Sequence, residues 1–261
     1  MLEVNELCVT YVSRGGTNQV VRDLSFSLGA GEMVGLVGES GSGKSAAIHA
    51  IAALPRPVKS VITGAVHLNG RDLLSLPPKQ VRQIHGTELG FVGQNPFGCL
   101  QPTLALHKQF HNILKAHRRT SSKADSRRQA QAALEGVGIL EPDRVLRGYA
   151  HHLSGGMAQR VVIAMATALR PRMLIADEPT TALDPTVQIQ ILDVLSDLRD
   201  REGTTLLIVT HDLGVVAAYC SRVLVMKSGL VVEQGDVQTL FETPAHPYTR
   251  ELFAQEELSA A

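Results

Sequence analysis

The sequence predicts an α/β fold with a mostly parallel sheet, further strands at the N-terminus and an inserted helical lobe. Three short apolar runs, at residues 33–37, 173–176 and 206–209, have the length of strands and alternate with helical patterns. Strands that are apolar at every position are typical of a sheet covered on both faces. Polar residues follow these runs, and open α/β sheets bind ligands at the carboxyl ends of their strands. We therefore expect a ligand site at that edge.

The N-terminal third is expected to consist of strands. The apolar residues at 7, 9 and 11 share one parity, as do those at 24, 26 and 28, and the polar stretch 13–19 between them is predicted to be a loop. Residues 64–68 have a strand pattern that ends in Asn69-Gly70, a pair that marks a tight turn between strands.

The middle of the chain changes to a helical pattern. A short polar helix from residue 79 precedes a strand at 90–94, and Asn95-Pro96 ends regular structure there. From about 103 to 148, apolar residues recur at helical spacing, with Phe110, Ile113 and Leu114 on one face. This segment is predicted to be a helical lobe inserted into the α/β core.

Two later helices carry clear start signals. Ser154 is placed to cap a helix over 155–169. Asp184 and Pro185 are the cap and first residue of the next helix, which Gly203 ends. Its buried stripe is expected to comprise Val187, Ile191, Val194, Leu195 and Leu198.

The most informative stretch fits the phosphate-loop pattern G-x-x-x-x-G-K-[ST] at every fixed position. It comprises Gly38, Glu39, Ser40, Gly41, Ser42, Gly43, Lys44 and Ser45, with Ala46 next on the helix that follows. The glycines let successive N–H groups point into one concavity, joined by the positive end of that helix. Lys44 would place a charge near the β- and γ-phosphates, and the Ser45 hydroxyl can bind the bridging Mg²⁺.

Chemistry on a bound nucleoside triphosphate needs a second Mg²⁺ group and a residue that orients water. Asp177 and Glu178 end the apolar strand at 173–176. Asp177 is the candidate Mg²⁺ group, through coordinated water, and Glu178 is the candidate to polarise the attacking water.

Composition excludes several other classes. Lys plus Arg and Asp plus Glu number 25 each, so the formal net charge is zero, which argues against a non-specific nucleic-acid binder. Cys8, Cys99 and Cys220 are far apart, so they suggest reduced thiols and neither a disulfide framework nor a zinc site. The N-terminus does not resemble a signal peptide, and no apolar run approaches the length of a membrane span.

With these motifs in place, residues 2 to about 253 resemble the nucleotide-binding subunit of an ABC (ATP-binding cassette) transporter. Six motifs occur in the family's order: 38–45 resembles Walker A, Gln94 the Q-loop glutamine, 153–157 the signature, 173–178 Walker B, 181–184 the D-loop and His211 the switch histidine. Met157 stands where the signature most often has glutamine.

The resemblance implies a role for each matching residue. Glu178, His211, Lys44 and Gln94 would be catalytic, and Ser45, Gln94 and Asp177 would bind Mg²⁺. Tyr11 would stack on adenine. Ser154, Gly155, Gly156 and Asp184 would contact the nucleotide held by a partner subunit, so each site would be assembled from two chains.

The resemblance also implies an ABC ATPase fold, a P-loop NTPase core with a RecA-like mostly parallel sheet, an N-terminal antiparallel β subdomain and an inserted helical subdomain. The expected divisions are 1–95 (antiparallel β and Walker A core), 96–158 (helical subdomain with the signature), 159–243 (Walker B, D-loop and switch core) and 244–261 (C-terminal tail). ATP and Mg²⁺ are the expected cofactors. The expected partners are a second ABC ATPase subunit, two transmembrane permeases and, indirectly, a substrate-binding protein.

Within the family, the stretch 228–235, Phe241 and the tail 246–250 resemble importers of oligopeptides, dipeptides and nickel complexes. The chain has no cysteine beyond Cys220, so it is expected to be similar to the short, nickel- or metallophore-type members. Such a subunit would work at the cytoplasmic face of the plasma membrane.

Two rival functions remain open. One is a soluble ABC-type ATPase, such as the accessory ATPase of the carbon–phosphorus lyase system. The other is a regulatory module that binds ATP without turnover, which Glu178 and His211 argue against. His107 and His111 are four residues apart and could share a metal, but a polar helix face is the favoured interpretation.

Overall fold

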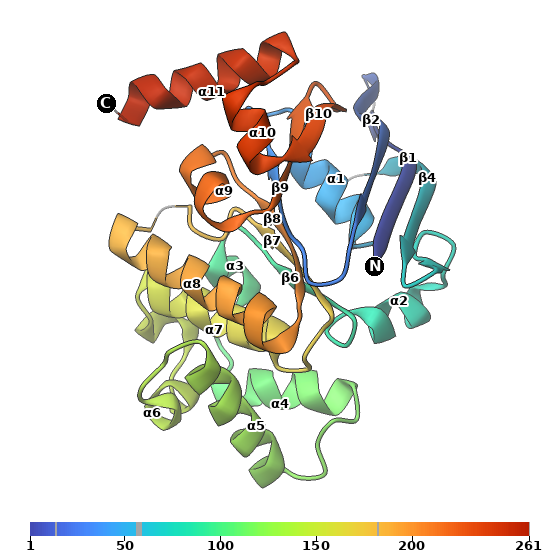
Figure 1. Cartoon of the computed structure of the whole chain (residues 1–261). Coiled ribbons are helices and arrows are strands. Elements are labelled where there is room, and N and C mark those ends of the chain that lie inside the picture. The colour runs from blue at the N-terminus through green and yellow to red at the C-terminus, as the bar shows by residue number, and fades with distance from the viewer. Residues whose placement is uncertain (14, 56–58, 182, 261) are drawn as a thin grey trace. The chain divides into compact units, whose positions relative to one another are not determined.

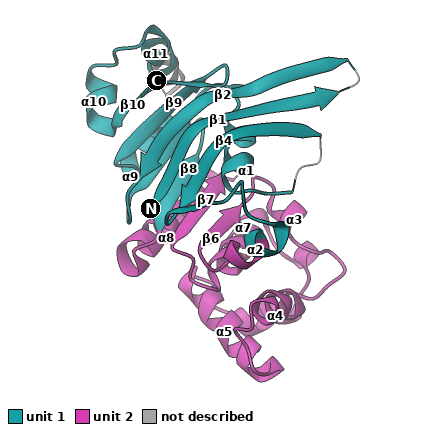
Figure 2. Cartoon of the chain, turned by 90° about the vertical axis from the view of Figure 1, so that its right-hand side faces the viewer, with its two compact units in different colours: residues 1–81, 205–261 teal, residues 82–204 magenta. Residues whose placement is uncertain are grey.

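The computed structural model describes residues 1–13, 15–55, 59–181 and 183–260, with side chains described up to residue 254. The chain forms two compact units (Figure 2). Unit 1 comprises residues 1–81 and 205–261, and unit 2 comprises residues 82–204. Unit 2 is therefore inserted, in sequence, between the two segments of unit 1.

An antiparallel sheet opens unit 1, with strand order β2-β1-β4-β5 (Figure 1). Its strands are β1 (Leu2–Ser13), β2 (Gly16–Leu28), β4 (Ser60–Leu68) and β5 (Arg71–Asp72). Asn69 and Gly70 have φ of +51° and +79°, as a two-residue hairpin turn of type I′ requires. The turn predicted at Asn-Gly is therefore confirmed.

The loop predicted over residues 13–19 is wrong at residues 13 and 16–19, where the strands continue, and Arg14 lies outside the described residues. Val12 pairs with Thr17 and Ser13 with Gly16, so β1 and β2 form one long hairpin. β1 is also paired on its other side with β4 as far as Tyr11 and Ser60. Residues 16–19 are in a strand because they pair with residues 10–13 of β1, which the hydrophobic pattern alone does not predict.

The other strands of unit 1 are β3 (Met33–Val37), β8 (Thr205–Val209), β9 (Arg222–Lys227) and β10 (Leu230–Asp236). β3 is parallel to β8 on one side and to β9 on the other, and β10 is antiparallel to β9. Every residue of β3 and β8 is buried, as the all-apolar runs predict. The helices of this unit are α1 (Lys44–Ile51), α9 (Leu213–Tyr219), α10 (Val237–Glu242) and α11 (Pro247–Ala260).

The chain enters unit 2 through α2 (Pro78–Ile84), and this unit contains two parallel strands, β6 (Leu89–Val92) and β7 (Met173–Asp177). Between them lie α3 (Pro96–Cys99), α4 (Leu106–Ala116), α5 (Lys123–Gly136), α6 (Pro142–Arg147), a 3₁₀ turn (Ala150–His152) and α7 (Gly155–Thr167). α8 (Pro185–Glu202) follows β7. Phe110 and Leu114 are completely buried, whereas Ile113 is half-buried, so the helical pattern is confirmed and its predicted inner face is confirmed in part.

The predicted ends of α8 are confirmed. The Asp184 carboxylate accepts a hydrogen bond from the Val187 amide at 3.1 Å, and Pro185 is the first helical residue. Gly203 ends the helix in the left-handed conformation, with φ of +68°.

In the part of the chain that the structure describes, no helix combines the length and apolar composition needed to cross a membrane.

Candidate active site

The glycine loop of unit 1 lies between β3 and α1, in the strand–loop–helix context that its motif predicts. Gly38, Gly41 and Gly43 have φ of +146°, +81° and +105°, values that are strained for any residue with a side chain. Lys44 begins α1. The successive amides of such a loop, together with the helix N-terminus, form a concave anion site.

Close packing explains two of the glycines. A Cβ on Gly38 would lie 2.1 Å from the Met226 carbonyl oxygen, and one on Gly43 would lie 2.4 Å from the Val20 carbonyl oxygen. In addition, the Gly229 amide donates to the Ser42 carbonyl at 2.8 Å. The loop is therefore held against backbone of β2, of β9 and of the turn between β9 and β10.

The Lys44 side chain lies over the loop. It is only 7% exposed, and its Nζ donates to the carbonyl oxygens of Gly38 at 2.6 Å and Glu39 at 2.9 Å. Ser42 Oγ is buried and has no hydrogen-bond partner among the described residues. Ser45 is exposed in the first turn of α1. A buried ammonium and an unsatisfied hydroxyl beside glycine amides fit a polyphosphate.

The predicted switch histidine follows the strand next to the loop strand. Leu36 of β3 pairs with Val209 of β8, and the Thr210 amide donates to the Leu36 carbonyl at 3.2 Å. Because parallel strands end at one edge of a sheet, His211 leaves β8 at the edge where β3 leads into the glycine loop. Tyr11, the predicted adenine-stacking residue, is half-buried in β1, and its role stays a prediction.

In unit 2, the predicted carboxylates follow β7 and the predicted glutamine follows β6. Val92 of β6 pairs with Ala176 of β7, so Gln94 and Glu178 each lie two residues beyond that pair. Gln94 Nε2 donates to Glu178 Oε2 at 2.6 Å. The parallel register thus brings together two residues that are 84 positions apart.

Glu178 has a second partner and an unusual backbone. Thr181 Oγ1 donates to the same Oε2 atom at 2.9 Å, a contact that the sequence motifs did not single out. Glu178 also has φ of +45°, in the left-handed region that costs a non-glycine residue roughly 1–2 kcal/mol. A carboxylate held by two donors on a strained backbone is typical of a functional position. Asp177, directly before it, is 5% exposed.

The start of α7 is exposed, as its predicted role requires. Ser154 is an exposed N-cap whose Oγ accepts from the Met157 amide at 3.4 Å. A Cβ on Gly156 would lie 2.5 Å from Val187 Cγ1 of α8, so glycine permits the close contact of these two helices. Of the predicted D-loop residues, Ala182 lies outside the described residues.

The structure thus places the predicted residues in two groups, which we describe separately. The glycine loop, Tyr11 and His211 belong to unit 1, and Gln94, Asp177, Glu178 and the start of α7 belong to unit 2. The motifs missed one residue beside the glycine loop, Tyr248, whose hydroxyl accepts a hydrogen bond from the Glu39 amide at 3.1 Å. The tail containing Tyr248 is distinctive in sequence, but nothing in that sequence indicates that Tyr248 contacts Glu39, 209 positions earlier.

The two histidines that could share a metal each have a contact through Nδ1. His107 Nδ1 lies 3.0 Å from the Leu146 carbonyl, and His111 Nδ1 lies 2.7 Å from Ser126 Oγ, so each imidazole has its own structural partner. Across the residues that the structure describes, no group of three or more His, Cys, Asp or Glu side chains could hold a metal ion.

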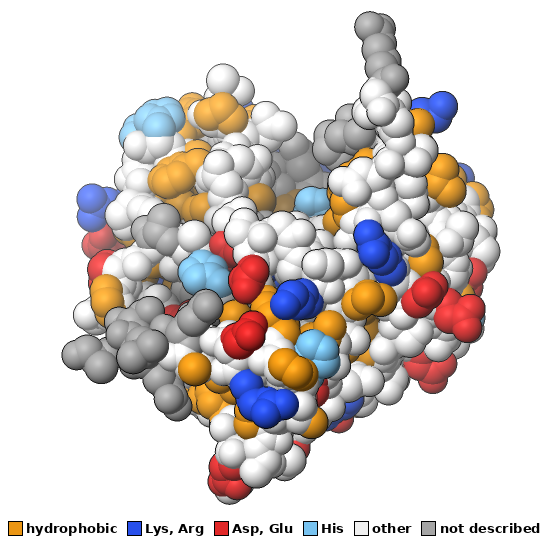
Figure 3. All heavy atoms as spheres, turned by 90° about the horizontal axis from the view of Figure 1, so that it is seen from above, with side chains coloured by type: hydrophobic (Ala, Val, Ile, Leu, Met, Phe, Trp, Pro, Cys, Tyr) orange, Lys and Arg blue, Asp and Glu red, His pale blue; other side chains and the backbone are white. Residues whose placement is uncertain are grey.

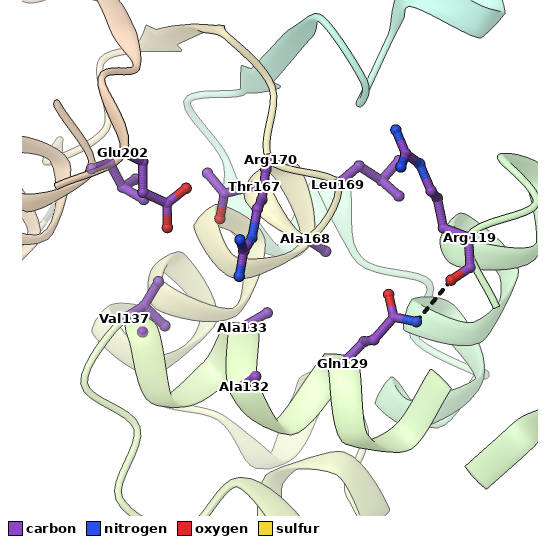
Figure 4. Close-up of a pocket in the computed structure, with 12 residues that line it drawn as sticks. Arg119, Gln129, Ala132, Ala133, Val137, Thr167, Ala168, Leu169, Arg170 and Glu202 are labelled. Carbon is purple, nitrogen blue, oxygen red and sulfur yellow. Dashed lines mark hydrogen bonds between the residues drawn. The ribbon is translucent and has the colours of Figure 1, made fainter. Parts of the chain in front are cut away.

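A cleft of about 330 Å³ in unit 2 is a separate feature (Figure 4). It lies among α5, the end of α7 and the end of α8, where Gln129 donates to the Arg119 carbonyl at 2.7 Å. Its described lining contains none of the predicted site residues.

A glycine loop that joins the carboxyl end of a parallel strand to a helix defines a P-loop protein. Comparison with known proteins then identifies the family, because residues 21–181 match the family model described as ABC transporter. The chain is 45% identical, over 98% of its length, to the peptidoglycan transport ATP-binding protein YejF of Agrobacterium fabrum. It is 44% identical, over 97% of its length, to the oligopeptide transport ATP-binding protein OppD of Bacillus subtilis. It spans 47% of the first relative and 71% of the second.

A solved structure agrees with this result. The dimeric post-hydrolysis state of the ATP-binding cassette MJ0796, bound to ADP and Pi, matches with a TM-score of 0.80 and 28% identity, covering 91% of this chain and 99% of that one. The chain therefore belongs to the ABC transporter family and has the ABC ATPase fold predicted from its motifs.

Proposed function

We propose that this chain is the ATP-hydrolysing subunit of an ABC importer for peptides, and that it works through ATP-driven closure of a pair of such subunits. The observation that carries the proposal is the glycine loop with the buried Lys44 ammonium folded over it. The relatives named for oligopeptide and peptidoglycan transport support the peptide cargo. They favour transport over the accessory role in a soluble enzyme complex.

Binding would be the work of unit 1. The loop from Gly38 to Ala46 and the start of α1 would bind the phosphates of ATP, and the Lys44 ammonium would contact phosphate oxygens from its place over the loop. Tyr11 would contribute stacking on the adenine ring.

Three groups suit Mg²⁺, which prefers oxygen ligands. They are the exposed Ser45 hydroxyl, the Asp177 carboxylate and the Gln94 side-chain amide. When bound, Mg²⁺ would neutralise charge on the phosphates. Hydrolysis of the bond to the γ-phosphate then needs only a correctly placed water molecule.

Placing and polarising that water is the role we give to Glu178. Hydrogen bonds from Gln94 and Thr181 hold its carboxylate at the end of β7. A carboxylate held in this place can accept a proton from the attacking water. His211 would contribute a further polar contact to the phosphate that leaves.

Closure would depend on the start of α7. Its exposed Ser154 and first-turn amides can face the γ-phosphate held by a partner subunit. A helix-terminus contact of this kind contributes about 0.3–1 kcal/mol, and at best about 2 kcal/mol. It therefore cannot bind nucleotide alone, but it makes closure depend on an intact triphosphate, and hydrolysis would release the pair.

The subunit would act with two transmembrane permeases, and indirectly with a substrate-binding protein, from the cytoplasmic face of the plasma membrane. The second ABC ATPase subunit would be a related chain or a copy of this one. On the face shown in Figure 3, basic and acidic side chains are interspersed, which fits protein partners better than nucleic acid.

Three measurements test the proposal. Purified protein should release phosphate from ATP, and release should require Mg²⁺. Affinity purification from membranes should recover two polytopic proteins with the chain, and stimulation of phosphate release by peptides in the reconstituted complex would identify the cargo. Activity without any membrane partner, in a complex of soluble enzymes, would instead support the accessory ATPase.

A further inference from the structure

A buried tyrosine of the C-terminal segment of unit 1 contacts the glycine loop. Tyr248, in the first turn of α11, is 3% exposed. Its hydroxyl oxygen accepts a hydrogen bond from the Glu39 amide at 3.1 Å. Glu39 is the second residue of the phosphate-loop motif, so the tail reaches the loop at its beginning.

The contact acts on the same peptide group that holds Lys44. The Gly38 carbonyl and the Glu39 amide belong to one planar unit. Lys44 Nζ donates to that carbonyl at 2.6 Å, and Tyr248 accepts from that amide. Because carbonyl and amide point in opposite directions, Tyr248 fixes the peptide from the side opposite to Lys44. Gly38 makes this restraint necessary, since glycine permits peptide rotations that other residues resist.

Several contacts hold Tyr248 in place. The Glu233 carboxylate of β10 accepts hydrogen bonds from the amides of Ala245 at 2.7 Å and His246 at 3.1 Å. His246 Nδ1 in turn accepts from the Tyr248 amide at 3.1 Å. The start of α11 is thus tied to the sheet immediately before the tyrosine.

The ring and the hydroxyl are also restrained. Lys227 Nζ lies 4.2 Å from the centre of the Tyr248 ring, within the range of a cation–π contact. Burial raises the pKa of the Tyr248 phenol above its ordinary value, so the hydroxyl stays neutral at physiological pH. A neutral hydroxyl, held by its ring, is a permanent acceptor for the Glu39 amide.

We propose that Tyr248 is a positioning residue for ATP binding, because its hydroxyl fixes the Gly38–Glu39 peptide and thereby the place of the Lys44 ammonium. The inference rests on the proposed function, since it concerns the site for the phosphates of ATP. The effect of Tyr248 would be on the loop that the phosphates would enter.

The direct test compares three variants in equilibrium binding of ATP, ADP and AMP. Tyr248→Phe keeps the ring and removes the hydroxyl. Thr243→Val is the matched control, because it removes another hydroxyl of the tail, one that donates to the Thr239 carbonyl at 3.1 Å. Lys44→Ala reports whether the loop binds phosphates at all.

We expect Tyr248→Phe to weaken ATP and ADP binding roughly two- to tenfold, the range for loss of one hydrogen bond. AMP binding and kcat at saturating ATP should change by less than about twofold, whereas KM for ATP rises. Thr243→Val should match the wild type. Equal ATP binding by Tyr248→Phe and the wild type, with binding lost in Lys44→Ala, would overturn the positioning role alone. Undiminished binding by Lys44→Ala would overturn the proposed phosphate site itself.

A second measurement needs no variant and decides the matter if Tyr248→Phe does not fold. The Glu39 amide hydrogen of the nucleotide-free wild type should exchange with solvent slowly, because Tyr248 holds it. Exchange at the rate of an unstructured amide would show that the hydrogen bond does not exist in solution, and the inference would then fail.

Discussion

Replacing Gly156 by alanine tests the packing that positions the start of α7. The added Cβ would lie 2.5 Å from Val187 Cγ1, whereas carbon atoms in contact prefer about 3.5–4.0 Å. The helices must therefore separate by about 1 Å locally, or Val187 must leave its rotamer, which is stiff in a helix. Overpacking of this kind costs roughly 1–3 kcal/mol, and the higher helix propensity of alanine returns up to about 1 kcal/mol.

We therefore expect Gly156→Ala to lower the free energy of unfolding by about 1 kcal/mol, measured by urea unfolding and circular dichroism. Val187→Ala removes the methyl group that obstructs the new side chain, so the double variant should be less destabilised than the two single changes predict by addition. Gly136→Ala is the control, because a Cβ there meets nothing within 4 Å, and it should be neutral or slightly stabilising. Additive effects of Gly156→Ala and Val187→Ala would refute the close contact between α7 and α8.

Three further predictions concern other parts of the molecule. Lys44→Ala should abolish ATP binding in a direct binding assay, because the ammonium over the loop is lost; full retained affinity would show that the phosphates bind elsewhere. Glu178→Gln should still bind ATP but lower the rate of phosphate release roughly 100-fold or more, the usual contribution of a general base, and unchanged turnover would remove Glu178 from that role. In unit 2, a hydrogen bond from Arg127 holds the pKa of Asp143 below its ordinary value of 3.8. A lowered folded-state pKa stabilises the protein above the unfolded pKa, and this contribution is lost as the pH falls through the folded value. Asp143→Asn should therefore melt at a lower temperature than the wild type at pH 7, and the difference should close below about pH 4; a difference that persists in acid would exclude the ion pair as its cause.

Local signals predicted much of the fold. Residues 33–45 predict the glycine loop and its flanking elements, because the residues of the strand, the three glycines and the start of the helix follow one another in the sequence. The ends of α8 follow from Asp184 and Gly203 for the same reason, since a cap acts within one turn. Where the physical cause is local, the prediction is confirmed.

Contacts that depend on distant chain segments were not predictable. The strand at residues 16–19 depends on pairing with residues 10–13 of β1. The two donors to Glu178 depend on the parallel register of β6 and β7 and on the turn after β7. Tyr248 meets Glu39 only because β10 and the start of α11 return the chain to the glycine loop. Hydrophobic periodicity has no information on such pairings.

The proposed mechanism requires two ATP-binding subunits to form a dimer when ATP is bound. The most direct measurement is therefore the mass of the Glu178→Gln protein in solution. Sedimentation would be recorded with ATP and with ADP, for this chain alone and mixed with a second cassette purified from the same membrane complex. With ATP, we expect the mass of a dimer in at least one of the two samples, the chain alone or the mixture. With ADP, we expect the mass of separate chains in both samples. The same mass with either nucleotide in both samples would contradict it.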